Sequence, residues 1–223
     1  MSAKKVKPPP AWSEIQGVYD QLLAEYPNPQ TELNFDGPFQ LIIAVILSAQ
    51  CTDERVNKTT PDLFKKYPTA KKLGAAKQAD VEKLVHSCGF YRAKAKAIIS
   101  TAKDLTEKFG DTVPRTLEEL ITLRGVGRKT ASVVLNQAFG LPAIAVDTHV
   151  ARVSQRLGWA HSDDAVKIEF ELREIFPEDH WATINTLLIL HGRRICKSRK
   201  PLCPACPVKR HCRYYRDTFG EPS

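Results

Sequence analysis

The sequence predicts an all-α protein. Helix-start and helix-stop residues recur along the chain, and no segment alternates apolar and polar residues as a half-buried strand would. The strongest helical signal runs from Arg128 to Phe139, where apolar residues repeat at i, i+3, i+4, i+7 and i+8 before Gly140. A length of 223 residues allows one or two domains.

The part of the chain before Arg128 predicts a series of helices separated by short connections. Ser13 and Gln16 form a capping-box pattern for the first helix. The run from Phe39 to Gln50 is apolar nearly all round, which favours a buried central helix, although periodicity alone leaves a buried strand open. Thr60 before Pro61 indicates a helix start. The expected helices are 13–26, 39–50, one beginning at 60, 78–87, 92–109 and 116–123.

The part after Gly140 continues the same pattern. Helical signals cover 148–157, 163–176 and 179–194. A proline-rich segment that contains four cysteines follows, and we expect it to be a loop with a short tail after it.

Composition excludes several classes of protein. With 43% hydrophobic and 26% charged residues, the chain falls in the ordinary globular range. The longest apolar stretch, Leu41 to Ala49, is far shorter than the roughly 20 residues that span a bilayer. Residues 1–11 form a basic, proline-rich tail without the apolar core of a signal peptide. We therefore expect a cytoplasmic protein with no membrane partner, associated with the nucleoid if it is bacterial.

Positive charge is concentrated near the end of the chain. The chain has 33 Lys and Arg against 25 Asp and Glu, a net charge of +8. The segment from His191 to Arg216 contains Lys and Arg at nine positions and no Asp or Glu. Clustered cations favour binding to a phosphate backbone, because they release its counterions. A solvated basic face, or compensation for four thiolates, is the alternative.

Four of the six cysteines lie close together in the sequence, with the spacing C-x6-C-x2-C-x5-C. In a reducing compartment such a group indicates a metal centre, because exposed thiols without one would oxidise. Zinc sites usually pair two short C-x2-C spacings, whereas an iron–sulfur cluster accepts irregular spacing. The spacing favours a cluster and leaves zinc as the competitor. The four are Cys196, Cys203, Cys206 and Cys212.

The other two cysteines, Cys51 and Cys88, are isolated in the sequence and have apolar surroundings. Such a cysteine is typically a small buried hydrophobic residue.

The segment LRGVGRKTA at 123–131 predicts a short helix, a tight G-V-G turn and a long helix. Glycines expose backbone N–H groups, and the helix that follows presents its positive end, so a phosphate can bind there. A plain helix-to-helix connection has the same pattern.

With these residues in view, the chain resembles a known family. LRGVGRKTA is similar to the helix-hairpin-helix of DNA-repair glycosylases, and VDTHVARV at 146–153 resembles the aspartate-containing segment that follows it. LSAQCTD at 47–53 and the four-cysteine spacing complete a resemblance to endonuclease III along most of the chain. The resemblance implies an all-α fold of two lobes, a helical barrel lobe at 30–142 with the hairpin and an iron–sulfur lobe formed by 12–29 with 143–223.

The resemblance also implies a reaction. It makes the chain a bifunctional DNA glycosylase and AP lyase, which excises oxidised pyrimidines from duplex DNA in base excision repair through a Schiff base and β-elimination. Lys129 would be the nucleophile, since the helix end and Arg128 both disfavour an ammonium there. Asp147 would assist it and stabilise the positive transition state. Local sequence alone makes Lys129 an ordinary exposed charge and Asp147 a helix N-cap.

The resemblance implies further contacts with DNA, because an enzyme that acts on a base must flip it out of the duplex and fill the gap. Gln50 and the pair Phe90 and Tyr91 are the candidates to fill the gap: Gln50 would occupy the hole, and the loop of Gly89 and Phe90 would wedge the opposite strand. An aromatic residue such as Phe90 at a helix junction is also typical of a core. Asp53 and His149 would support the groove. The hairpin residues implied to hold DNA are Gly125, Val126, Gly127, Arg128 and Thr130.

The implied cofactor is a [4Fe–4S] cluster on Cys196, Cys203, Cys206 and Cys212, and the implied partner is duplex DNA with oxidised pyrimidines or abasic sites, bound by a monomer. Arg124 departs from the family pattern, which commonly has proline there, and we expect it to loosen the turn. The alternatives are a mismatch- or uracil-type glycosylase of the same superfamily and a non-catalytic DNA-binding module.

Overall fold

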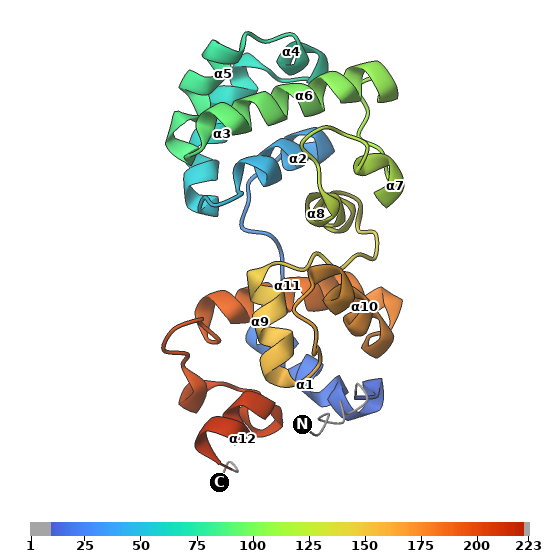
Figure 1. Cartoon of the computed structure of the whole chain (residues 1–223), viewed down its shortest axis with the longest axis vertical. Helices are drawn as coiled ribbons and strands as arrows, with labels where there is room; N and C mark the ends of the chain where they lie inside the picture. Colours follow the sequence, from blue (N-terminus) through green and yellow to red (C-terminus); the bar gives the residue numbers. More distant parts are fainter. Residues whose placement is uncertain (1–9, 221–223) are drawn as a thin grey trace, which may run out of the picture. The chain divides into compact units, whose positions relative to one another are not determined.

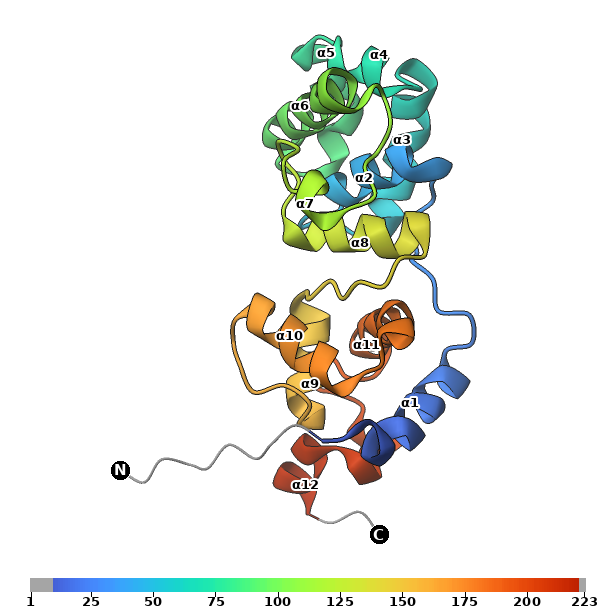
Figure 2. The same cartoon turned by 90° about the vertical axis from the view of Figure 1, so that its right-hand side faces the viewer.

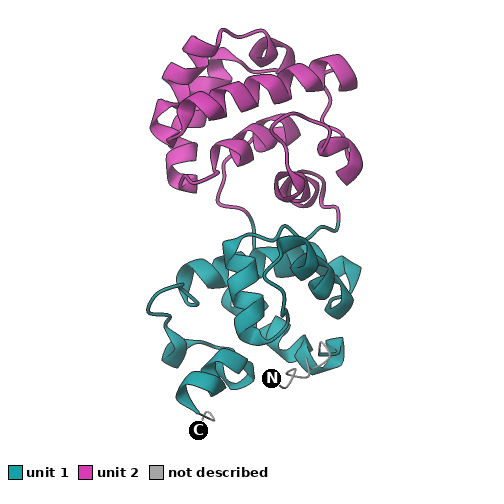
Figure 3. Cartoon of the chain, in the orientation of Figure 1, with its two compact units in different colours: residues 1–30, 142–223 teal, residues 31–141 magenta. Residues whose placement is uncertain are grey.

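The structure, a computed structural model, describes residues 10–220. That range contains helices and no strands, which confirms the predicted all-α class. Of the predicted tail 1–11, all but Pro10 and Ala11 lies outside the described residues. The chain forms two compact units (Figure 3): unit 1 is Met1–Gln30 with Pro142–Ser223, and unit 2 is Thr31–Leu141.

Unit 2 is built around one buried helix, α2 (Gly37–Leu47), whose residues from Leu41 to Leu47 are all buried. It packs against α3, α6 and α8 (Figures 1 and 2). The helices and 3-10 segment of this unit are α2 (Gly37–Leu47), α3 (Asp53–Lys66), α4 (Ala70–Gly74), α5 (Gln78–Val85), η1 (His86–Cys88), α6 (Tyr91–Phe109), α7 (Leu117–Leu120) and α8 (Arg128–Phe139).

The apolar run is therefore a helix and not a strand. Because it is apolar on every side, it can be covered by neighbours all round. It ends at Leu47, three residues before the predicted end, so that Gln50 lies in a turn with a left-handed backbone (φ +52°).

Two predicted helix starts are wrong. Thr60 does not begin a helix: it lies buried inside α3, and Pro61 follows it within the same helix. The actual N-cap of α3 is Thr52, whose hydroxyl accepts from the backbone N–H of Arg55, and two acidic residues follow it. Ser13 is not an N-cap either, since α1 begins at Trp12.

Unit 1 joins the first helix of the chain to its last third. The apolar side of α1 (Trp12–Glu25) packs against α11 (Trp181–Arg194), and α9 (Thr148–Leu157) packs against α11 as well. The segment expected to be a short tail contains a helix, α12. The remaining elements of this unit are α10 (Ala165–Ile175), η2 (Glu178–His180), η3 (Cys203–Ala205), η4 (Lys209–His211) and α12 (Arg213–Phe219).

The two helices that carry the predicted catalytic residues start and stop where the sequence places them. Both α8 and α9 end at a glycine in the left-handed conformation, Gly140 and Gly158. No helix within residues 10–220 is long and apolar enough to cross a membrane.

Candidate active site

The segment between α7 and α8 is a tight hairpin. Leu123 and Val126 point into unit 2, and the N–H of Val126 donates to the carbonyl of Leu123 at 3.0 Å. Gly125 has φ +92°, and a Cβ there would lie 3.1 Å from the Cβ of Ala97 on α6. A glycine is thus required at 125 by both backbone conformation and space. Because the side chain of Val126 is buried, any contact it makes with DNA is through its backbone.

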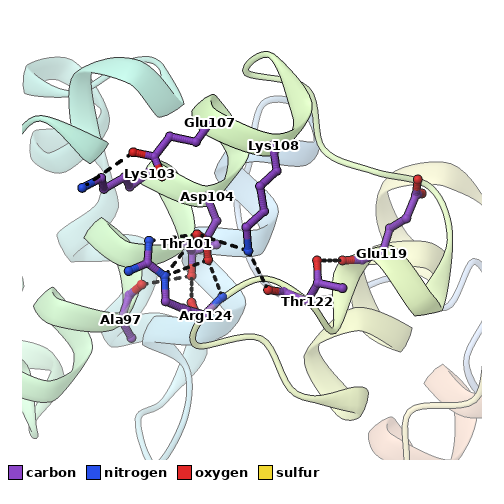
Figure 4. A network of polar contacts seen from close by, with 9 residues as sticks. All are labelled: Ala97, Thr101, Lys103, Asp104, Glu107, Lys108, Glu119, Thr122 and Arg124. Carbon is purple, nitrogen blue, oxygen red and sulfur yellow. Dashed lines mark hydrogen bonds and ion pairs between the residues drawn. The ribbon is translucent and has the colours of Figure 1, made fainter.

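Arg124 fastens the hairpin to α6 and does not loosen it, which corrects the expectation (Figure 4). Its backbone N–H donates to Oδ2 of Asp104 at 2.8 Å, and its side-chain Nη2 donates to Oδ1 at 2.8 Å. Its carbonyl accepts from Oγ1 of Thr101 at 2.7 Å. The backbone N–H and C=O of one residue are therefore both held by side chains of α6.

Asp104 is the centre of this network. Its side chain is only 2% exposed, and Lys108 adds a second cation at 3.4 Å (Figure 4). Burial favours the protonated carboxyl, but hydrogen bonds from Arg124 and the charges of Arg124 and Lys108 outweigh it and hold the pKa at about 2. The carboxylate thus remains charged and neutralises Arg124.

Lys129 is exposed at the second position of α8, directly after the hairpin. Gly127 is the N-cap, and a Cβ there would meet nothing within 4 Å. Open space at Gly127 and the positive end of α8 make this point suited to a phosphate. A primary amine at this position is a side chain that can act as a nucleophile.

Asp147 is the N-cap of α9 in unit 1. Its Oδ1 accepts from the backbone N–H groups of His149 and Val150 at 2.8 and 2.9 Å, and its Oδ2 lies 3.3 Å from Nδ1 of His149. These contacts fix the carboxylate on a rigid helix end, and its side chain is 17% exposed. The capping role inferred from local sequence is present.

The residues implied to fill and wedge the duplex have exposed, strained positions. Gln50 is exposed at φ +52°, and Phe90 is 70% exposed at φ +45°. Exposure of Phe90 excludes the core alternative for this aromatic residue. Tyr91, which begins α6, lies with its ring 4.5 Å from that of His86, and Asp53 is the first residue of α3.

The four clustered cysteines of unit 1 line one cavity, together with residues of α9, α11 and α12. Burial raises the pKa of Cys206 to about 12 and raises the pKa of Cys203 and Cys212 as well, with a further contribution from the neighbouring thiols. These three sulfurs are poor isolated thiolates, but a metal centre stabilises their charge. Within residues 10–220, no three His, Cys, Asp or Glu side chains are arranged so that they could hold one metal ion.

Two donors face these sulfurs. Nη1 of Arg156 lies 3.4 Å from Sγ of Cys196, and Nε2 of His191 lies 3.5 Å from Sγ of Cys206. Burial lowers the pKa of His191 to about 4, so the imidazole is neutral near pH 7. Its Nδ1 is 3.1 Å from the hydroxyl of Tyr26. The cysteines therefore fit a [4Fe–4S] cluster, which would be anionic and would gain from such donors.

Sequence reasoning missed the residues that hold these sites in place. Asp104, Arg156 and His191 each lie on a helix, whereas the residue that each supports lies in a loop distant in the sequence. Arg156 also donates to the carbonyls of Lys197 and Ser198, which anchors the start of the cysteine loop to α9. Such contacts between distant segments leave no local pattern, although Arg156 lies on the polar side of an amphipathic helix.

The sequence and structure match one family of known proteins. The profile of the HhH-GPD superfamily of base excision DNA repair proteins matches residues 43–178. The chain is 48% identical to an endonuclease III of Synechocystis over 84% of this chain and 86% of that protein. It is 46% identical to an endonuclease III of Rickettsia prowazekii over 91% and 96%. A solved endonuclease III–DNA covalent intermediate superposes with a TM-score of 0.88 at 43% identity, covering 93% of this chain and 98% of that one. The chain belongs to the endonuclease III family of helix-hairpin-helix base excision DNA repair proteins.

Proposed function

We propose that this chain is a bifunctional DNA glycosylase and AP lyase that removes oxidised pyrimidines from duplex DNA and then cleaves the strand at the abasic site. The observation that carries the proposal is the exposed amine of Lys129 at the start of α8, directly after the hairpin whose open Gly127 suits a phosphate. A hydroxyl residue at 129 would support base removal by water alone, whereas an amine supports the lyase step too.

In this reaction the neutral amine of Lys129 attacks the sugar carbon that carries the damaged base, and the bond to the base breaks with its electron pair leaving on the base. The bond between that carbon and the ring oxygen then breaks, which opens the sugar and gives a Schiff base. The Schiff base acidifies the neighbouring C–H. Loss of that proton expels the 3′ phosphate, and water releases the lysine. Asp147 stabilises the positive charge that develops on the sugar.

Gln50 and Phe90 fill and wedge the duplex in this proposal. Base flipping leaves a hole in the stack, and exposed side chains on tight left-handed turns are preset to enter it without unfolding a helix. Tyr91, Asp53 and His149 support these positions, and Gly125, Val126, Gly127, Arg128 and Thr130 hold the backbone phosphates through the hairpin and the end of α8.

A [4Fe–4S] cluster on Cys196, Cys203, Cys206 and Cys212 is the proposed cofactor. It orders the loop between α11 and α12, which carries Lys and Arg and no Asp or Glu. Analysis that finds about four iron and four sulfide per chain supports it, and one bound zinc overturns it.

Borohydride trapping tests the activity. Wild type, Lys129→Ala and Lys103→Ala are mixed with two duplexes, one with a single oxidised pyrimidine and one with an abasic site. Lys103 is a matched control, because it is an exposed lysine of the same unit paired with Glu107. We expect covalent complexes with wild type and Lys103→Ala on both duplexes, and none with Lys129→Ala.

Each other outcome has a definite meaning. Trapping on the abasic duplex alone would indicate that the enzyme excises another kind of base, such as a mismatched base or uracil. Analysis of the base released from defined duplexes identifies it. Trapping on neither duplex, with DNA still bound, indicates a non-catalytic DNA-binding module. Trapping by Lys129→Ala moves the nucleophile to another amine.

A further inference from the structure

Two cysteines outside the cluster, which the sequence presents as isolated, lie side by side in unit 2. The thiols of Cys51 and Cys88 are near enough to interact, since the Cys88 thiol contributes to raising the pKa of Cys51, although 37 positions separate the two residues in the sequence. Cys88 is 2% exposed, whereas Cys51 is partly exposed. The pair thus consists of one partly exposed cysteine and one buried cysteine.

The backbone around both thiols is irregular. Cys51 lies between the end of α2 and the N-cap of α3, and its neighbour Gln50 has a left-handed backbone. Cys88 ends η1 and precedes Gly89 (φ +66°) and Phe90. Neither cysteine belongs to an α-helix, so the sulfurs can approach each other through local adjustment without breaking a helix.

Surrounding contacts hold the two segments together. Oγ1 of Thr59 on α3 lies 2.8 Å from Oγ of Ser87 on η1. Lys94, which is 6% exposed, donates its Nζ to the carbonyl of Cys88 at 2.6 Å. The Lys94 charge favours a thiolate at Cys51, but burial is the larger influence and raises the pKa of Cys51. Oxidation should therefore be slow at neutral pH and faster in alkali.

We propose that Cys51 and Cys88 form a redox modification site, at which a peroxide converts the thiol pair into a disulfide that joins the segment carrying Gln50 to the segment carrying Phe90. The effect of this disulfide on function rests on the proposed contacts of Gln50 and Phe90 with DNA.

The chemistry balances with peroxide as the oxidant. The Cys51 thiolate attacks one peroxide oxygen, the O–O bond breaks, and Cys51 becomes a sulfenic acid as the first water leaves. Cys88 then attacks that sulfur, the S–O bond breaks, and a second water leaves. Two thiols lose two protons and two electrons in total, and the peroxide is reduced to two waters. A dithiol reductant reverses the change.

The disulfide has a structural consequence. Two neighbouring sulfurs that are not bonded must move to about 2.05 Å when a disulfide forms, which pulls the two segments toward each other. Misplacement of a site by about 1 Å can cost roughly 100-fold in function. Because Gln50 and Phe90 directly flank the cross-link, we expect the oxidised protein to bind an abasic duplex at least tenfold more weakly, and the dithiol reductant to restore binding.

The experiment uses the cluster-loaded full chain, treated with limiting hydrogen peroxide at pH 7 and pH 9. Free thiols are alkylated, and peptides are mapped without reduction. We expect one pair of peptides joined through Cys51 and Cys88, formed faster at pH 9. Iron content serves as a control that the cluster cysteines have not been released. Cys51→Ala and Cys88→Ala should give no joined peptides.

Binding of a duplex with a stable abasic analogue is measured before and after oxidation. A loss of affinity in wild type, absent in both alanine variants and reversed by reductant, supports the proposal. Sulfinic acid at Cys51 without a cross-link overturns it, and so does a cross-link that leaves affinity unchanged. Failure of the reduced wild type to bind or trap DNA would count against the proposed enzyme activity instead, which separates the two.

Discussion

Asp104 shows how one buried carboxylate stabilises a loop through charge. Because its pKa is held at about 2 in the folded protein against an ordinary value of 3.8, the ionised form favours folding above the ordinary value. That stabilisation is lost as the pH falls from about 4 through about 2. The shift corresponds to about 2 kcal/mol at neutral pH.

We therefore expect Asp104→Asn to lower the free energy of opening of the hairpin and α6 by about 2 kcal/mol at pH 7, with the difference from wild type shrinking below about pH 4. Amide hydrogen exchange of α6 measures it. Glu107→Gln is the matched control, since Glu107 is an exposed partner of Lys103 on the same helix and should change little. Equal losses in both variants would show that the clamp on Arg124 is unimportant.

A second prediction at the residue scale concerns Tyr26 and His191 and the reduction potential of the proposed cluster. A thiolate bound to a cluster can only accept a hydrogen bond, so Nε2 of His191 must donate to Cys206 and Nδ1 must accept from the hydroxyl of Tyr26. Tyr26→Phe removes the contact that fixes this tautomer. Since hydrogen bonds to sulfur favour the reduced, more negative cluster, we expect the reduction potential to fall by tens of millivolts, where about 59 mV is a tenfold change in equilibrium.

Voltammetry of the cluster-loaded protein measures this shift. Tyr19→Phe is the control, because Tyr19 is a buried tyrosine of α1, the helix that Tyr26 follows, and does not line the cysteine cavity. An unchanged potential in Tyr26→Phe would mean that the phenol packs against His191 without orienting it.

At the residue scale, the sequence identifies the candidate reactive residues better than the residues that hold them in place. The types and spacing of Lys129, Asp147 and the four cysteines suffice to propose their roles. The contacts of Arg124 could not be predicted, because its partner Asp104 lies 20 positions away on α6. The left-handed turn at Phe90 and its exposure likewise depend on how unit 2 packs.

At the scale of the element, we expect the two glycines of the hairpin to respond differently to substitution by alanine. Gly125→Ala forces a side chain into a left-handed backbone and against Ala97, and we expect a cost of about 1–3 kcal/mol together with weaker DNA binding. Gly127→Ala meets no neighbour and has an ordinary φ of −91°, so the fold should keep its stability.

Both variants are compared by chemical denaturation followed by circular dichroism and by binding to an abasic duplex. Since a phosphate is proposed to approach Gly127 closely, its alanine variant should lose affinity while keeping full stability. Wild-type affinity in Gly127→Ala would refute a close phosphate at that position.

Helices with a cap at one end and a glycine at the other were predictable, as α8 and α9 show. The error at Thr60 has a physical cause. A Thr-Pro pair fits the first turn of a helix, but a helix can also continue through an exposed proline such as Pro61 when packing of its buried residues compensates for the lost hydrogen bond. The helix α12 was missed because its short sequence, Arg213–Phe219, has little helical preference without the core of unit 1 beneath it.

At the scale of the whole molecule, the cysteine cavity and the tryptophans belong to the same unit. Trp12, Trp159 and Trp181 all belong to or pack against the core of unit 1, which also includes Cys212. We expect removal of the cluster by a chelator to change tryptophan fluorescence and increase hydrogen exchange in α9 and α12. Exchange in α6 of unit 2 should stay the same, and equal loss of protection in both units would contradict this prediction.

The two-lobed architecture was inferred from the resemblance to a known family and not from the pattern of apolar and polar residues. Periodicity alone predicts a series of helices. It does not indicate that α1 packs against α11, because the whole of unit 2 separates these two helices in the sequence. The relatives supply that information, because their folds have already been solved.

Unit 1 is discontinuous, and this affects the order in which the protein can fold during synthesis. Tyr26 and His191, which are in contact, are 165 positions apart. At roughly 5–20 residues per second, a ribosome makes His191 about 8 to 33 s after Tyr26. The contiguous unit 2 is completed within that interval and is free to fold first, while the apolar side of α1 waits uncovered and is exposed to chaperones until its partner helix emerges.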